Sequence, residues 1–168
     1  MEDQRIILDT LTTNDEDSLI FKGENGHSIL FFKDNCDKIK LINDKTGYYF
    51  NPSSNLWTSA DKCSFLRLIA DYLENRTIEI INKYLIDKNK SKEIDLLVKI
   101  IKKVRTAKHI ESVYKLSIHY FIDKDFQNNL NSDPNMLPIK NGKIIDIRTL
   151  NTRLRKIDDY FDFELDVN

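Results

Sequence analysis

The sequence contains one dense group of basic side chains that could bind phosphate. Five lysine and arginine residues fall within the ten positions from 99 to 108: Lys99, Lys102, Lys103, Arg105 and Lys108. Cationic side chains at this spacing, on and just after a helix, could contact successive phosphate groups of a nucleic acid. Lysine-rich helix faces are also common as plain solvated surfaces. The pattern therefore indicates a candidate nucleic-acid-binding site, with a solvated face as the alternative.

The charge distribution makes this candidate site a local feature. The 168-residue chain has a formal net charge of -1, so no overall attraction draws it to DNA or to a membrane. Residues 83–108 hold nine basic and three acidic side chains, whereas both ends of the chain are acidic. A polyanion is therefore expected to bind at the middle of the chain.

Recognisable catalytic motifs are missing from the sequence. Gly142-Lys143 is followed by Ile144, so the phosphate-binding P-loop pattern Gly-x-x-x-x-Gly-Lys-Ser/Thr does not occur. Residues 15–17 and 123–125 have the acidic-x-acidic spacing of divalent-metal sites. A solvated loop and the start of a short helix are the favoured interpretations of these two stretches. We therefore predict no catalytic residue and no metal site in this chain.

The histidines and cysteines form no ligand pattern either. His27, His109 and His119 are scattered, and only the last two fall close to one face of a predicted helix. Cys36 and Cys63 have no CxxC partner, which favours buried free thiols in a reducing compartment.

Aromatic residues offer a second route to nucleic acid. Tyr48, Tyr49, Phe50 and Trp57 lie close together in the sequence and could stack on the bases of a single strand. Such stacking contributes roughly 1 to 3 kcal/mol per base. Aromatic residues on a β-hairpin more often pack against a neighbouring helix, so core packing is the favoured interpretation, particularly for Trp57.

Composition indicates a folded chain with one domain, or one domain and a small annex. Hydrophobic residues make up 40% and charged residues 32% of the sequence. No apolar run approaches the roughly 20 residues that span a bilayer. The N-terminal residues also lack the pattern of a signal peptide. We therefore expect neither secretion nor membrane insertion.

Turn chemistry and hydrophobic alternation predict three β-hairpins. The first covers residues 18–33, around Gly-Glu-Asn-Gly, and the second covers residues 47–59, around Pro-Ser-Ser-Asn. In the third, residues 143–147 pair with residues 152–156.

Helical periodicity predicts about four helices between the hairpins. The first begins near Ala60 and has a break or kink at Asn75, and the next begins after an N-cap at Ser91 and ends near Thr106. A third helix includes residues 110–121, and a short one precedes a turn at Asp133-Pro134. The predicted fold class is α+β, with a mainly helical middle flanked by β-hairpins.

The middle and end of the chain resemble a known module. Trp57 precedes an amphipathic helix, and the C-terminal stretch reads LPIKNGKIIDIRTLNTRLRKIDDYF. This arrangement is similar to the domain ahead of the superfamily 3 helicase in poxvirus-type primase-helicases, which other large DNA viruses, phages and plasmids share. The residues that fall on the family pattern are Trp57, Asn141, Gly142, Ile145, Asp146, Thr149, Arg153, Asp159 and Tyr160.

The resemblance covers residues 45–168 and departs from the family pattern in one turn. Leu150-Asn151 stands where the family usually has glycine, so the turn geometry is expected to differ. Asn141 and Gly142 would shape a turn, and Asp146 would hold that turn by hydrogen bonding. Residues 1–44 match nothing in the family, and we expect them to be a β-hairpin annex or a linker from a preceding primase domain.

The resemblance implies a function without catalysis by this fragment. The chain would be an accessory domain of a viral DNA-replication primase-helicase, linking the primase to the helicase ring and guiding DNA. Implied partners are single-stranded or forked DNA, the adjoining helicase and primase domains, and further copies in a hexamer. The fragment would need no cofactor, whereas the full-length helicase would use ATP and Mg, in the host cytoplasm (the viral factory) or the virion. The alternative is an oligomerisation or protein-interaction module that does not bind DNA.

Overall fold

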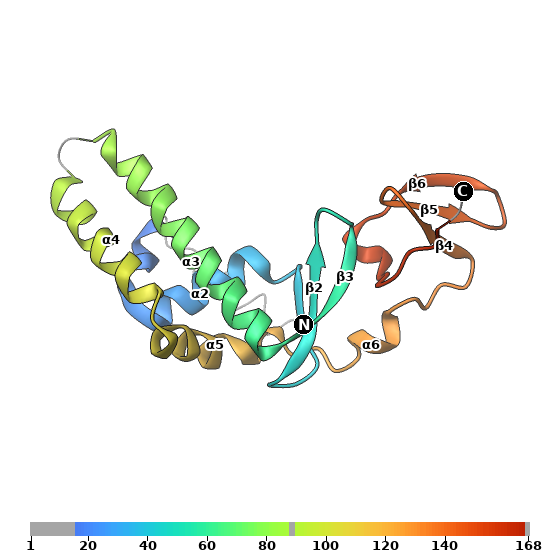
Figure 1. The fold of residues 1–168 in the computed structure, drawn as a ribbon, viewed down its shortest axis with the longest axis horizontal. Coiled ribbons are helices and arrows are strands. Elements are labelled where there is room, and N and C mark those ends of the chain that lie inside the picture. Colours follow the sequence, from blue (N-terminus) through green and yellow to red (C-terminus); the bar gives the residue numbers. More distant parts are fainter. Residues whose placement is uncertain (1–15, 88–89, 167–168) are drawn as a thin grey trace. The chain divides into compact units, whose positions relative to one another are not determined.

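A computed structural model describes residues 16–87 and 90–166 and divides them into two compact units (Figure 1). The first unit contains residues 16–36, 63–87 and 90–121 and is helical. The second contains residues 37–62 and 122–166 and holds two small β-sheets. The fold is therefore α+β with a helical middle, as predicted. The predicted boundary between residues 44 and 45 rests on the family resemblance and stays a prediction.

The helical unit is built from a 3-10 helix and four α-helices. Their bounds are η1 Glu16–Lys22, α2 Gly23–Asn35, α3 Lys62–Leu85, α4 Ser91–Val104 and α5 Ala107–Phe121. Helix α3 continues through Asn75, so the predicted break is wrong. Ser91 is the first helical residue of α4 and Lys90 is its N-cap, without a side-chain cap hydrogen bond. The predicted N-cap at Ser91 is therefore wrong, whereas the break near Thr106 is confirmed.

The predicted hairpin over residues 18–33 is wrong, because these residues form η1 and α2. Gly26, which suggested a turn in the sequence, lies inside α2. A Cβ atom added there would lie 2.0 Å from the backbone oxygen of Leu19 in η1. This close approach places Leu19, Ile20 and Leu30 in one core with Ile80 of α3 and Leu97 of α4. Burial of that core outweighs the local turn propensity of Gly-Glu-Asn-Gly.

The second unit contains two three-stranded antiparallel sheets and a short helix. The first sheet has the order β1 Ile39–Leu41, β2 Thr46–Asn51 and β3 Leu56–Asp61. The second has the order β4 Met136–Ile139, β5 Lys143–Asp146 and β6 Asn151–Leu154, and α6 Phe126–Asn129 precedes it. The two predicted hairpins β2–β3 and β5–β6 and the short helix α6 are confirmed. Strands β1 and β4 were not predicted.

The segment after β6 ties the two sheets of this unit together. The indole nitrogen of Trp57 in β3 donates to the Ile157 backbone oxygen at 2.9 Å, and its backbone nitrogen donates to the Phe161 oxygen at 2.8 Å. Arg155 Nη2 donates to the Ser54 backbone oxygen at 3.0 Å and pairs with Glu164 at 2.5 Å. The C-terminal family motif therefore packs against the first sheet.

Candidate nucleic-acid interface

The five basic residues of the candidate site lie on α4, at its C-terminal end and at the start of α5. Helix α4 buries Leu97 and Val104 on one side. All five basic side chains are exposed. Lys99 and Lys102 are three residues apart on the helix, so they are neighbours on its surface. The spacing recognised in the sequence thus corresponds to exposed cations.

Two of the five are engaged in ion pairs. Lys103 Nζ lies 3.1 Å from Glu24 Oε1 of α2, and Arg105 Nε donates to Glu74 Oε2 of α3 at 3.1 Å. Arg105 Nη2 forms a second bond to Glu74. These contacts lower the pKa of the Glu74 carboxyl because the guanidinium stabilises the carboxylate. Lys103 and Arg105 therefore also fasten α2 and α3 to the end of α4.

Three lysines of the candidate site remain available to an external phosphate. In the part of the chain that the structure describes, Lys99, Lys102 and Lys108 make no ion pair. Two further exposed lysines, Lys92 and Lys115, follow the same pattern. Each is seven residues from a member of the site, Lys92 from Lys99 and Lys115 from Lys108, so each lies on the same helix face. That seven-residue spacing was the sequence signal that could have found them.

The aromatic alternative is wrong for Trp57. Its side chain is 1% exposed, and its ring centroid lies 4.6 Å from that of Phe126 and 5.7 Å from that of Phe50. Tyr160 stacks at 6.4 Å with an interplanar angle of 13° and has a positive φ of 54°. Trp57 is therefore a core residue of the second unit and cannot stack on a base in this conformation.

The other family-motif residues shape the second sheet. Asn141 and Gly142 have positive φ angles of 64° and 67° in the turn between β4 and β5. Asp146 accepts a hydrogen bond from the backbone nitrogen of Arg148 at 2.9 Å and from its Nε at 3.1 Å. It therefore holds the following turn, between β5 and β6, and not the Asn-Gly turn as predicted. Arg148 lowers the pKa of the Asp146 carboxyl through these bonds.

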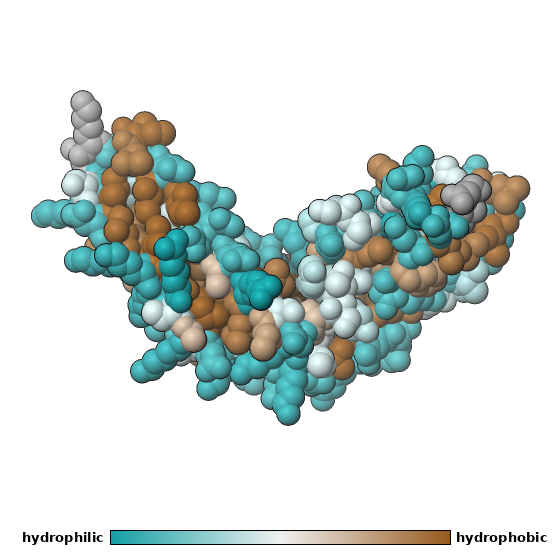
Figure 2. Space-filling view, in the orientation of Figure 1, coloured by the Kyte–Doolittle hydropathy of each residue, from teal (hydrophilic) through white to brown (hydrophobic). Residues whose placement is uncertain are grey.

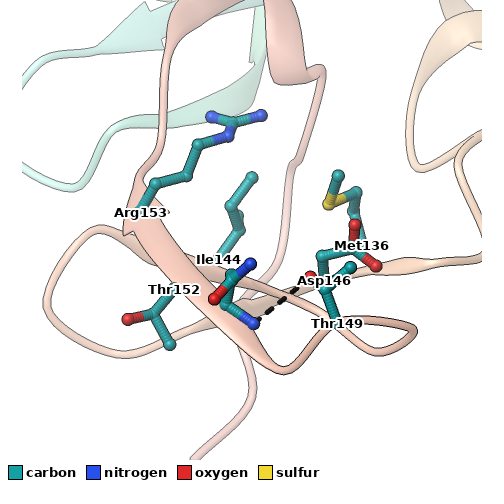
Figure 3. A pocket seen from close by; sticks show the side chains of 7 residues that line it. Met136, Ile144, Asp146, Thr149, Thr152 and Arg153 are labelled. Atoms are coloured by element: carbon teal, nitrogen blue, oxygen red, sulfur yellow. Dashed lines mark hydrogen bonds between the residues drawn. The ribbon is translucent and has the colours of Figure 1, made fainter.

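A small hollow lies beside this turn but has no free charged group among its lining residues. Met136, Ile144, Asp146, Thr149 and Arg153 are among these residues (Figure 3). Asp146 is bonded to Arg148, as described. Arg153 forms two bonds with Asp159, at 2.8 and 2.6 Å. The charged side chains of the hollow thus stabilise the sheet, and we assign no ligand to it.

The structure also brings together two histidines that the sequence left scattered. His27 Nδ1 of α2 lies 2.8 Å from His109 Nε2 of α5, and His109 Nδ1 lies 2.9 Å from Glu24 Oε1. Burial lowers the pKa of His27 to about 4 and also lowers that of His109. His119, the predicted neighbour of His109, is exposed. A separation of 82 residues left no local signal for the pair.

Two predictions about single side chains are wrong. Asp17, predicted in a solvated loop, is 7% exposed and pairs with Lys83 and with Arg76, whose Nη2 lies 3.3 Å away. Asp15 lies outside the described residues. The predicted burial of the free cysteines is also wrong, since Cys36 is only partly buried and Cys63 is exposed.

An exposed apolar surface lies on α3 and α4. Ile78 follows Glu74 by one turn on α3, and Val98 precedes Arg105 by seven residues. Because Glu74 and Arg105 pair, Ile78 and Val98 lie on the same side of the two helices α3 and α4. Ile78, Leu85 and Val98 are 39%, 62% and 44% exposed, and we name them the apolar α3–α4 face. Figure 2 shows apolar side chains gathered along these helices.

Among residues 16–87 and 90–166, no three histidine, cysteine or acidic side chains gather as a metal site. None of the helices within these residues has the length and apolarity needed to cross a membrane.

Comparison with known proteins adds no family assignment, since no family model and no curated protein matches the chain.

Proposed function

We propose that this chain is a non-catalytic accessory domain that contacts DNA phosphates through Lys99, Lys102 and Lys108. The observation that carries the proposal is the exposure of these three lysines, without an ion pair in the described structure. A lysine without a carboxylate partner can neutralise a DNA phosphate, and so release the counterion bound to that phosphate, without first breaking an ion pair within the protein. Lys103 and Arg105 contribute less, because each would first have to leave a carboxylate.

The wider role that we propose rests on the family resemblance of residues 45–168. The domain links the primase to the superfamily 3 helicase ring of a viral replication protein and guides single-stranded or forked DNA. Its partners are DNA, the adjoining domains and further copies of the protein, in the host cytoplasm or the virion. ATP and Mg serve the full-length helicase, and this chain itself contributes no catalysis.

Fluorescence anisotropy with labelled single-stranded and forked DNA tests the proposed contact. The variant Lys99→Glu/Lys102→Glu/Lys108→Glu removes the three lysines and leaves the pairs of Lys103 and Arg105 in place. The matched control Lys45→Glu/Lys124→Glu/Lys143→Glu makes the same charge change on exposed lysines of the second unit. We expect the first variant to lose DNA binding and the control to keep most of it. Equal losses would contradict the proposed site.

The second candidate function is a protein-interaction module, and the apolar α3–α4 face favours it. Exposed apolar side chains grouped on two helices are a common feature of protein interfaces. This reading predicts concentration-dependent oligomers in sedimentation velocity, which Ile78→Glu/Val98→Glu would abolish. Leu116→Glu on α5 is the control, since Leu116 is 40% exposed but lies on another helix. Oligomers without salt-sensitive DNA binding would favour this function over the first.

A further inference from the structure

A continuous chain of polar contacts crosses the core of the helical unit. It runs from Glu24 Oε1 to His109 Nδ1 at 2.9 Å, from His109 Nε2 to His27 Nδ1 at 2.8 Å, and from His27 Nε2 to the Ile20 backbone oxygen at 2.8 Å. His27 and His109 are 1% and 2% exposed. These contacts therefore join α2, α5 and η1 at a place where water cannot easily replace a missing hydrogen-bond partner.

The number of hydrogens decides which of these contacts can form. This chain of polar contacts has three links, and the group at each end is an oxygen acceptor: the Glu24 carboxylate at one end and the Ile20 carbonyl at the other. Three hydrogen bonds therefore need three N–H hydrogens, whereas two neutral imidazoles carry only two. With both rings neutral, one of the three contacts brings two acceptors together without a hydrogen between them.

The electrostatic surroundings indicate which contact lacks the hydrogen. A bond to a carboxylate is stronger than a bond to a neutral carbonyl, so His109 Nδ1–H donates to Glu24. His109 Nε2 is then an acceptor, and because the bond to the carboxylate polarises the ring, this nitrogen accepts more strongly than the Ile20 carbonyl. His27 therefore donates to it from Nδ1–H, and His27 Nε2 faces the Ile20 oxygen without a hydrogen. The other charged group acting on the rings is Lys103 of α4, which lies 3.1 Å from Glu24.

We propose that the bond between His27 Nε2 and the Ile20 oxygen is a proton-controlled latch that attaches η1 to α2 and α5. With both rings neutral the latch is open. When the pair takes up one proton, His27 gains an N–H at Nε2 and all three bonds form at once. Because burial lowers the pKa of both rings, the proton arrives only on the acid side of neutrality.

Glu24→Gln provides a sharp test, because it changes the hydrogen count without changing the size of the side chain. The amide group that this substitution introduces can donate to His109 Nδ1, so the two ring hydrogens become available for the ring–ring contact and for Ile20. The latch in this variant would then close without an added proton. Lys103→Gln is the matched control, since it removes the ion pair with Glu24 but leaves the hydrogen count unchanged.

Ring N–H groups can be counted by long-range proton–nitrogen NMR of the 15N-labelled chain. At pH 7.5 we expect His27 Nε2 to lack a hydrogen in the wild type and in Lys103→Gln, and to carry one in Glu24→Gln. On acidification the wild type should gain one ring N–H at His27 Nε2, together with shifts of the η1 amides. Exposed His119 in the same spectrum serves as the reference for a ring in solvent. A hydrogen on His27 Nε2 of the wild type at pH 7.5, or identical spectra for wild type and Glu24→Gln, would overturn the proposal.

Discussion

His27 Nδ1 and His109 Nε2 lie 2.8 Å apart in the core of the helical unit, although 82 positions separate the two residues in the sequence. Both rings are buried, and burial lowers the pKa of each, so the stability of the folded protein must depend on pH. A lowered pKa means that the folded state binds the proton less readily than the unfolded state does.

The free energy of unfolding should therefore fall as the pH is lowered. The pKa of His27 is about 4 in the folded protein and about 6.5 in an unfolded chain. Stability is fully present above pH 6.5 and is lost as the pH falls towards 4, by about 3 kcal/mol in all. Urea denaturation at pH 7, 6, 5 and 4 measures this loss. His27→Gln should reduce the slope and His119→Gln should not, whereas parallel curves for all three proteins would contradict the assignment.

Leu150→Gly should stabilise the second unit. Leu150 has a φ of 59°, which favours glycine, and its side chain is 77% exposed, so little packing is lost. Glycine adopts this left-handed conformation without steric strain. The substitution should therefore add roughly 1 kcal/mol to the free energy of unfolding, which raises the melting temperature by a few degrees. Ile147→Gly, beside the same turn, is the control and should not stabilise. A lower melting temperature for Leu150→Gly would contradict the strain at this turn.

The fluorescence of Trp57, the single tryptophan of the chain, should report a buried ring. Because the ring packs against Phe126 and donates to Ile157, its emission should be blue-shifted and poorly quenched by acrylamide in the folded protein. Unfolding in urea should remove both properties. Quenching of Trp57 by single-stranded DNA under folding conditions would show that the ring stacks on bases after all.

Asp17→Asn should destabilise the helical unit by roughly 2 kcal/mol. The carboxylate is nearly buried and binds Arg76 and Lys83 of α3, so its removal leaves the partly buried Arg76 guanidinium short of a charged partner. Glu79→Gln removes the other, exposed partner of Arg76 and should cost less than about 0.5 kcal/mol. Chemical denaturation of the two variants side by side measures the difference, and similar effects would contradict a larger contribution from Asp17 than from Glu79.

Local patterns in the sequence predicted most elements but not the contacts between distant residues. Helices α3 to α5 and the hairpins β2–β3 and β5–β6 followed from hydrophobic period and turn residues. The hairpin over residues 18–33 failed because the packing of Gly26 against Leu19 decides that region, and this contact depends on the core around Ile80 and Leu97.

The candidate site was predictable only in part for the same reason. Lys99, Lys102 and Lys108 could be identified from their spacing, but the partners of Lys103 and Arg105 come from α2 and α3. Helical periodicity shows that a side chain faces away from the core, and it says nothing about a carboxylate that another helix brings near. The His27–His109 contact was hidden from the sequence in the same way.

The salt dependence of DNA binding tests the proposed function most directly. The logarithm of the DNA-binding constant falls as the logarithm of the salt concentration rises. If Lys99, Lys102 and Lys108 each neutralise one phosphate of a single strand, reversing their charges should make this negative slope shallower by about 2. We predict this change together with a loss of affinity at low salt, while the control in the second unit keeps the wild-type slope. A wild-type protein that does not bind DNA at low salt, or a triple variant with an unchanged slope, would contradict DNA contact through this site.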